Sequence, residues 1–265
     1  MSGRNNRFFP EMLARAESGD AKAQFAVAVF YLRGDGVDRN ETTAADWLKK
    51  AAERGNADAL RHLGSFYAAG RGVGQDFAKA VEWWHRAAEQ GIESVQFDLG
   101  RAYAEGEGVE QDFAKAAEWY LKAAEQGHAE ARCALGALYR EGNGVAKDLG
   151  KALDWFRKSA TQGQPNAQAT LGDMYAFGEG VEQDDAKAAE WRLKAAEQGH
   201  AHAQFFLCMT YANGQGVEQS LERARFWASK AAEGGMPSIA FPDLDMIIDD
   251  DDDADSTNDE GDENA

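Results

Sequence analysis

The sequence predicts an all-α protein, a right-handed α/α solenoid of six 36-residue helix-turn-helix repeats. Three kinds of residue recur at a step of 36. Tryptophan is found at Trp47, Trp83, Trp119, Trp155, Trp191 and Trp227, and tyrosine at Tyr31, Tyr67, Tyr103, Tyr139, Tyr175 and Tyr211. The pattern Gly-x-Gly-Val begins at Gly34, Gly70, Gly106, Gly142, Gly178 and Gly214. A fixed period of this length is typical of stacked repeat proteins.

The period also sets the domain boundaries. The repeats fill residues 20–235 without an insertion, as 20–55, 56–91, 92–127, 128–163, 164–199 and 200–235. Residues 1–19 then form an N-terminal segment. One period before Trp47 lies Glu11, so residues 10–18 have the phase of a second helix. Because proline is favoured at the first position of a helix, we expect an orphan capping helix that begins at Pro10.

Each repeat reads as two helices. In the first half of repeat two, Ala59, Leu63, Gly64 and Tyr67 lie on one face of a helix. The two glycines of Gly-x-Gly-Val supply the backbone freedom that a helix stop and a turn need. The second helix has a capping residue at its start, which is Asn40, Asp76, Asp112, Asp148, Asp184 or Ser220. Neither helix can bury its apolar stripe alone, so the pairs must stack.

Charge is concentrated at the C-terminal end. The formal net charge is −18, and residues 243–265 contain twelve acidic residues and no Lys or Arg. We therefore expect segment 236–265 to end in a disordered acidic tail. Nucleic acids and anionic membranes require clustered basic residues, so neither is expected as a partner. A partner selected by charge would be basic.

Other features of the composition point to the cytoplasm. The sequence has two cysteines, too few for a disulfide framework, and no apolar run long enough to span a membrane. No signal peptide is recognisable at the N-terminus, so a reduced, cytoplasmic location is expected.

The repeat resembles the Sel1-like repeat, a 36-residue member of the tetratricopeptide-repeat-like superfamily. That pattern contains Leu-Gly before the tyrosine, Gly-x-Gly-Val, an aspartate, Lys-Ala, the tryptophan and Lys-Ala-Ala before a glycine. Repeat three matches it closely, whereas Val27-Ala28 and Leu207-Cys208 replace Leu-Gly in the terminal repeats. The resemblance implies a stack of helix pairs that binds other proteins.

No residue cluster indicates catalysis, a cofactor or a metal. The histidines are dispersed, and His128 and His200 share a position at which we expect them to start helices. Gly-x-Gly-Val follows a helix rather than a strand, so it lacks the context of a phosphate-binding loop. We expect no enzymatic activity, although a pair of catalytic carboxylates on the helices remains open as a minor alternative.

The positions that differ between repeats indicate where a partner binds. Counting from the first residue of each repeat, positions two, three, six, seven, ten, thirteen and fourteen vary and lie on one side of the first helix. We call this side the variable face, and the resemblance implies that it lines the concave surface. The candidate binding residues are Phe25, Val29, Arg61, Phe97, Arg101, Arg140, Asp173, Phe205 and Met209. The alternative for the phenylalanines is that they pack against adjacent helices.

Repeats three and five contain nearly the same 26 residues. From Gly106 and from Gly178 the copies differ at three places only, Phe113/Asp185, Tyr120/Arg192 and Glu130/His202. The scaffold is the same in both copies, and its surface residues differ.

The favoured function is a non-enzymatic adaptor that binds a polypeptide on its concave face, with phenylalanines as apolar anchors and arginines pairing carboxylates. The alternative is an immunity protein that neutralises a toxic secreted effector. We also consider that the acidic tail folds back over the arginines as an inhibitor.

Overall fold

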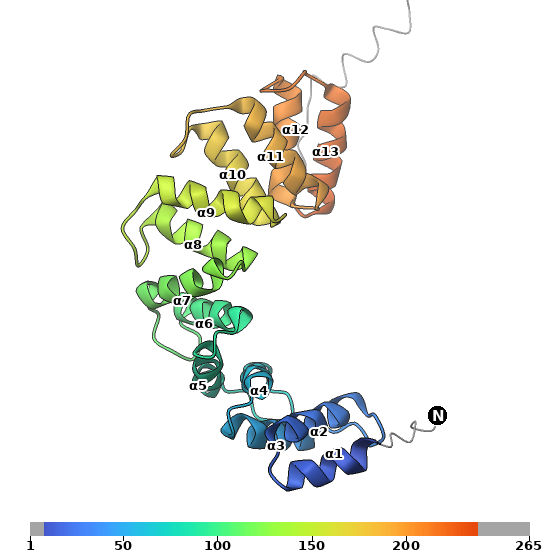
Figure 1. Ribbon diagram of the computed structural model, residues 1–265. Coiled ribbons are helices and arrows are strands. Elements are labelled where there is room, and N and C mark those ends of the chain that lie inside the picture. Colours follow the sequence, from blue (N-terminus) through green and yellow to red (C-terminus); the bar gives the residue numbers. More distant parts are fainter. Residues whose placement is uncertain (1–7, 238–265) are drawn as a thin grey trace, which may run out of the picture. The chain divides into compact units, whose positions relative to one another are not determined.

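The computed structural model describes residues 8–237, which contain thirteen α-helices and no strand (Figure 1). The helices are α1 Phe8–Glu17, α2 Ala21–Arg33, α3 Glu41–Glu53, α4 Ala57–Ala69, α5 Phe77–Ala88, α6 Glu93–Glu105, α7 Phe113–Glu125, α8 Ala129–Glu141, α9 Leu149–Thr161, α10 Pro165–Phe177, α11 Asp185–Glu197, α12 Ala201–Asn213 and α13 Leu221–Glu233. The all-α repeat solenoid predicted from the sequence is confirmed.

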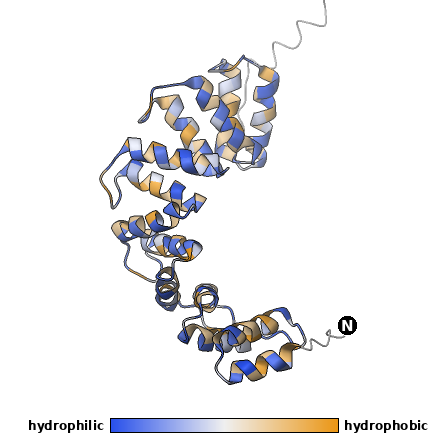
Figure 2. Cartoon of the chain, in the orientation of Figure 1, coloured by the Kyte–Doolittle hydropathy of each residue, from blue (hydrophilic) through white to orange (hydrophobic). Residues whose placement is uncertain are grey.

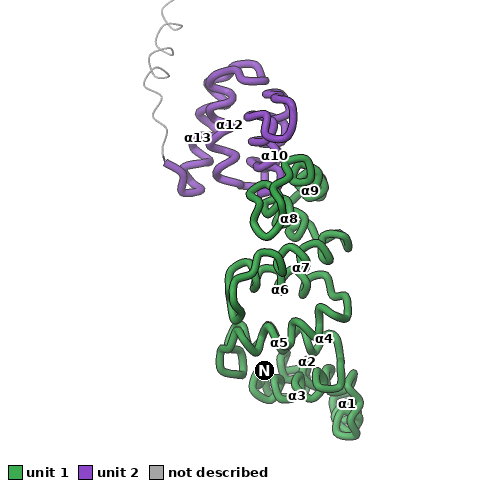
Figure 3. Tube along the Cα trace, turned by 90° about the vertical axis from the view of Figure 1, so that its left-hand side faces the viewer, with its two compact units in different colours: residues 1–164 green, residues 165–265 purple. Residues whose placement is uncertain are grey.

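The chain divides into two compact units (Figure 3). Unit 1 comprises residues 1–164 and contains α1–α9, and unit 2 comprises residues 165–265 and contains α10–α13. Within each unit every helix packs against the next helix along the chain. The even-numbered helices from α2 to α12 are the first helices of the repeats, and the odd-numbered ones from α3 to α13 are the second helices.

The predicted capping residues start the second helices. In repeat two the Asp76 carboxylate accepts a hydrogen bond from the backbone N–H of Lys79 at 3.0 Å. Asn40, Asp112, Asp148, Asp184 and Ser220 cap their helices in the same way. His128 and His200 start first helices as predicted, since Nδ1 of each accepts from the backbone N–H three residues later. Each of these bonds satisfies a backbone donor that the helix leaves free.

The two glycines of Gly-x-Gly-Val have different tasks. The first one ends the helix, as Gly70 does with φ of 67° in the left-handed region. The second one allows close packing between repeats. Gly72 also has a positive φ, and a Cβ there would collide with the backbone of Glu41 at the start of α3. A glycine is therefore required where the turn of one repeat rests on the second helix of the preceding repeat.

Apolar and polar residues alternate along the helices of both units (Figure 2). Alanines and leucines make up much of the buried core of each unit, as Leu99 does in unit 1 and Leu207 in unit 2. The periodic tryptophans are half-buried, and in the first five repeats a cation from the next turn lies over the ring. Lys122 Nζ, for example, lies 3.7 Å from the centre of the Trp119 ring. A Lys or Arg follows the tryptophan by three residues in all six repeats, and this packing explains it in the first five.

Two sequence-based expectations concern the ends of the chain. Helix α1 begins at Phe8, so the predicted start at Pro10 is wrong by two residues. Pro10 is still in the first turn, where its missing N–H costs no helical hydrogen bond. The predicted disordered tail lies outside the described residues, which end at 237.

Candidate functional site

All nine candidate binding residues are partly or fully exposed on first helices. In unit 1 they are Phe25 and Val29 on α2, Arg61 on α4, Phe97 and Arg101 on α6, and Arg140 on α8. In unit 2 they are Asp173 on α10, with Phe205 and Met209 on α12.

The phenylalanines of unit 1 are half-buried against rings of neighbouring helices. The Phe25 ring lies 5.5 Å from that of His62 on α4. The Phe97 ring stacks on His128 at 4.7 Å and touches Tyr120 at 5.7 Å. Packing against adjacent helices, the alternative considered above, therefore accounts for part of each side chain, and the remainder stays exposed.

The arginines of unit 1 already have partners. Arg61 Nη2 lies 3.9 Å from Asp58 and 3.1 Å from Nε2 of His62. Burial, followed by the Arg61 charge, lowers the pKa of His62, so the neutral ring accepts this hydrogen bond. Arg101 lies 3.9 Å from Asp98 in the same i, i+3 arrangement. These long surface pairs leave the guanidinium groups able to exchange partners.

A contact between a glycine of the first helix and a large side chain of the second helix recurs from repeat two to repeat five, and in repeat five the large side chain is charged. The glycine at position nine of the first helix packs under the side chain at position 29. A Cβ on Gly100 would lie 2.6 Å from the Tyr120 ring, and the same glycine in repeat four lies under Phe156. In repeat five the glycine is Gly172 and the residue above it is Arg192. A cation therefore occupies the place of an aromatic ring.

Arg192 is held by an ion pair within the repeat. Its Nη2 and Nε donate to the same Asp173 oxygen, Oδ1, at 2.7 and 3.2 Å. The Arg192 side chain is 8% exposed and that of Asp173 19% exposed. The guanidinium also lies over the Phe206 ring, 4.9 Å from its centre. Burial of a charge requires such a partner, which explains why Asp173 and Arg192 occur in the same repeat.

A pocket of about 450 Å³ opens beside this ion pair, between α10, α11 and α12. Phe205 and Met209, two of the predicted binding residues, form its apolar wall together with Phe206. Polar atoms surround the wall. The complete lining is Ala176, Phe177, Gln183, Asp185, Ala188, Arg192, Phe205, Phe206, Met209, Thr210, Asn213 and Gln215.

The sequence contained a signal for the pocket that the list of candidate residues did not use. Two of the three differences between the 26-residue copies, Asp185 and Arg192, line the pocket. The third, His202, contacts the pocket residue Phe206 with 4.6 Å between ring centres. All three differences therefore lie at one place in unit 2. Phe177, which is 69% exposed, was also missed, although it occupies variable position fourteen.

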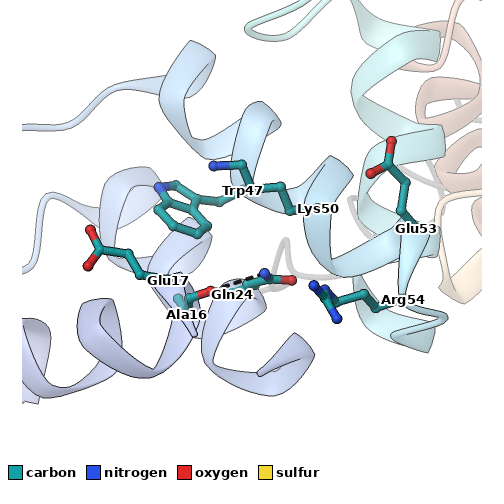
Figure 4. A pocket seen from close by; sticks show the side chains of 7 residues that line it. All are labelled: Ala16, Glu17, Gln24, Trp47, Lys50, Glu53 and Arg54. Atoms are coloured by element: carbon teal, nitrogen blue, oxygen red, sulfur yellow. Dashed lines mark hydrogen bonds between the residues drawn. The ribbon is translucent and has the colours of Figure 1, made fainter. Parts of the chain in front are cut away.

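A second pocket, of about 460 Å³, lies at the start of unit 1 (Figure 4). Gln24 Nε2 donates to the Ala16 carbonyl at 3.1 Å, whereas its buried Oε1 has no partner among the described residues. In Figure 4 the Arg54 side chain faces this amide. The equivalent oxygens of Gln96 and Gln168 accept from a glutamine at the position of Arg54. In repeat one Arg54 replaces the glutamine that makes this hydrogen bond in repeats three and five, and the pocket lies at the place of the missing bond.

The described residues show little that is suited to nucleophilic or metal chemistry. Burial raises the pKa of both thiols, Cys133 and Cys208, to about 11, so each is protonated at neutral pH. Across residues 8–237, His, Cys, Asp and Glu side chains nowhere gather in groups of three that suit a metal ion. No helix in that range is long and apolar enough to cross a membrane.

The sequence profile of the Sel1 repeat matches six segments of the chain. They are residues 21–56, 57–92, 94–128, 129–164, 165–200 and 201–236. A comparison with curated proteins gives no match.

Solved structures resemble this chain along most of its length. A protective antigen of uropathogenic Escherichia coli with the same repeat fold is 39% identical over 86% of this chain, with a TM-score of 0.81. The match covers 49% of the antigen, so this chain spans about half its length. A Sel1 repeat protein from Oxalobacter formigenes is 31% identical, with a TM-score of 0.70, over 86% of this chain and 97% of that protein.

An immunity protein from Pseudomonas aeruginosa is a more distant neighbour. It is 24% identical over 86% of each chain, with a TM-score of 0.48. This likeness is too distant to carry an argument about function.

Proposed function

Since the chain belongs to the Sel1 repeat family, we propose that it is a non-enzymatic scaffold that binds a polypeptide partner along the variable face of its first helices. This is the face expected from the sequence to be concave. Extended surfaces of stacked repeats are suited to polypeptides because each repeat adds one similar increment of contact area.

The division of labour within the repeat carries the proposal. Positions at which the residue type is kept in most repeats form helix caps, turns and the core, as Asp76, Gly72 and Leu63 illustrate. The candidate residues of the variable face are at least partly exposed and include phenylalanines, arginines and a methionine. Aromatic and arginine side chains are common energetic anchors of protein interfaces. A surface that holds the fold together would not need to change from repeat to repeat.

Affinity capture tests the proposal. The full chain is immobilised at physiological salt and exposed to lysate of the native host, and bound proteins are identified by mass spectrometry. A second column carries Phe97→Ala with Arg101→Glu on the variable face. A third carries Glu118→Ala with Glu125→Ala, two exposed residues of the second helix α7.

We expect one stoichiometric partner that is retained by the first and third columns and lost from the second. A partner that binds all three columns equally would place the interface elsewhere. A partner lost only from the third column would show that the second helices, and not the variable face, form the binding surface.

A second candidate function is neutralisation of a toxic effector. The net charge of −18 favours it, because an acidic protein captures a basic enzyme quickly and can block its active cleft. The captured partner distinguishes the two functions. An effector enzyme whose turnover stops at one equivalent of this protein would support neutralisation, whereas a partner that stays active would support the adaptor.

A further inference from the structure

The pocket of unit 2 differs from the equivalent place in repeats three and four. Its apolar wall consists of Phe205, Phe206 and Met209 on α12. The residues at the same positions of α8 are small, namely Cys133, Ala134 and Ala137. Phenylalanine also occurs at the position of Phe205 in repeats one and three, as Phe25 and Phe97, whereas Phe206 and Met209 are found at their positions in repeat six alone.

The pocket also exposes apolar surface to solvent. Phe177 at its edge is 69% exposed, and among the described residues only Phe8 and Phe226 are other large apolar side chains that are exposed. Phe205 and Met209 are half-buried. An exposed aromatic side chain beside a half-buried apolar wall is typical of a surface that covers a partner's side chain.

Arg192 gives the pocket a hydrogen-bond donor, and its positive charge is compensated by Asp173. Asp173 neutralises the guanidinium through Nε and Nη2. The remaining nitrogen, Nη1, donates to none of the described residues and is not fully buried, so a ligand in the pocket can reach it. A neutral acceptor satisfies such a donor without adding charge, and the peptide carbonyl is the neutral acceptor that every polypeptide offers.

The charge of the pocket is negative. Asp185 and Arg192 are its charged lining residues, and Asp173 already compensates Arg192. Asp185 accepts a hydrogen bond from Gln183 at 3.4 Å and forms no ion pair with a described residue. Residues 165–237 contain ten acidic and six basic residues. A ligand that carries a positive charge next to its apolar group is therefore favoured.

From these features we propose that the pocket binds an extended polypeptide segment in which a large apolar residue is followed by Lys or Arg. The apolar side chain packs on Phe205, Phe206 and Met209, a backbone carbonyl of the segment accepts from Arg192 Nη1, and the basic residue pairs with Asp185. This inference rests on the proposed function and adds the chemistry of the partner.

Peptide binding to the full chain tests it directly. The probes are fluorescein-labelled octapeptides that consist of Gly and Ser except for the two central residues. The first central residue is Leu, Phe, Met or Ser, and the second is Lys, Arg, Glu or Ser. Fluorescence polarisation should show the tightest binding for an apolar residue followed by Lys or Arg. Exchange of Lys for Glu should weaken binding roughly tenfold, as expected for loss of one charge-assisted contact.

Repeat three supplies the matched variants, because its residues are accommodated by the same scaffold. Asp173→Arg with Arg192→Tyr copies Arg101 and Tyr120, and should weaken every apolar–basic peptide roughly tenfold. Asp185→Phe copies Phe113, and should abolish the preference for Lys over Glu while apolar peptides still bind. Urea denaturation of each variant shows that it is folded.

Three results would overturn the inference: no peptide bound by the wild type at millimolar concentration, a preference for acidic peptides, or unchanged binding by Asp173→Arg with Arg192→Tyr. The proposed function has its own readout. If that double variant still captures the cellular partner while Phe97→Ala with Arg101→Glu loses it, the scaffold function stands and the pocket is not the site.

Discussion

Arg192 occupies the position at which repeats two to four place an aromatic side chain. Its charge is tolerated because Asp173 lies 2.7 Å away on the first helix of the same repeat. Removing the partner leaves the cation with 8% of its side chain exposed and no compensating charge. The pair is thus a local requirement of repeat five, linked to the pocket that it borders.

The pair leads to a stability prediction. Asp173→Ala should lower the free energy of unfolding by about 3 kcal/mol, the usual cost of an uncompensated buried charge. Asp173→Arg with Arg192→Tyr should recover most of this loss, since repeat three folds with that combination. Urea denaturation measures both. A single variant as stable as the wild type would show that solvent reaches Arg192 and that the charge is not buried in solution.

Three histidines predict how stability depends on pH. Burial lowers the pKa of His62, His85 and His200 below the ordinary value of 6.5. The unfolded chain then takes up protons more readily than the folded one as the pH falls below 6.5. Their contribution to stability is complete above pH 6.5 and is lost progressively below it. The thermal unfolding midpoint should be lower at pH 5.5 than at pH 7.5.

A variant isolates the histidine effect from that of the carboxylates. His62→Gln with His85→Gln removes two of the three groups, so the midpoint should change less between pH 7.5 and 5.5 than in the wild type. An identical pH profile for both proteins would contradict the assignment.

At the residue scale the sequence predicted which side chains are exposed better than it predicted which side chains contact one another. The nine candidate residues are all at least partly exposed, because the variable face was defined by helical period. The ring contacts of Phe25 and Phe97 could not be derived, since they join side chains that are far apart in the sequence. Arg192 was missed because it lies on the second helix, where the pattern of variable first-helix positions does not reach.

At the scale of elements, the turn between the two helices of a repeat is the point where successive repeats interlock. The second glycine of Gly-x-Gly-Val combines a positive φ with close contact to the preceding second helix, as Gly72 does against Glu41. Gly74, two residues further along the same loop, has no atom within 4 Å of its Cβ position. Gly72 is therefore a suitable position to test this contact, and Gly74 is a matched control.

Gly72→Ala should destabilise the protein by about 2 kcal/mol, because it adds both backbone strain and a steric clash. Gly74→Ala should change stability by less than about 0.5 kcal/mol. Urea denaturation of both variants measures the difference. Equal effects would mean that the turn adjusts without cost and does not lock the repeats together.

The elements themselves were largely predictable. A 36-residue period with caps at fixed places defines the start of each second helix, and the capping bonds form as expected. The start of α1 was two residues off, because a proline in the first turn is compatible with more than one starting position. The period runs through residue 164 without a break, so nothing in it indicates the two units of the structure.

At the scale of the whole molecule, charge should govern how the partner is captured. With a net charge of −18, association with a basic partner should slow as salt rises from 50 to 500 mM, while dissociation changes less. Surface plasmon resonance with the captured partner separates the two rates. An association rate that is independent of salt would show that the charge does not select the partner.

The fold of the chain could be predicted because the same sequence pattern recurs in all six repeats. The partner could not, because the proposed binding surface consists of the positions that differ between repeats, and these positions follow no period. The comparison of the two 26-residue copies shows the limit. The sequence predicted that the three differences lie on the surface, but Tyr120 and Arg192 are buried, and the sequence did not show that the differences meet at one pocket.

Photo-crosslinking tests the central claim, that the variable face contacts a polypeptide partner. Benzoylphenylalanine is placed at Phe177 on the variable face or at Phe226 on the second helix α13, two exposed positions of unit 2. Irradiation in lysate should give one discrete crosslinked protein from position 177 and none from 226. A crosslink from 226 alone would contradict the account and place the partner on the second helices.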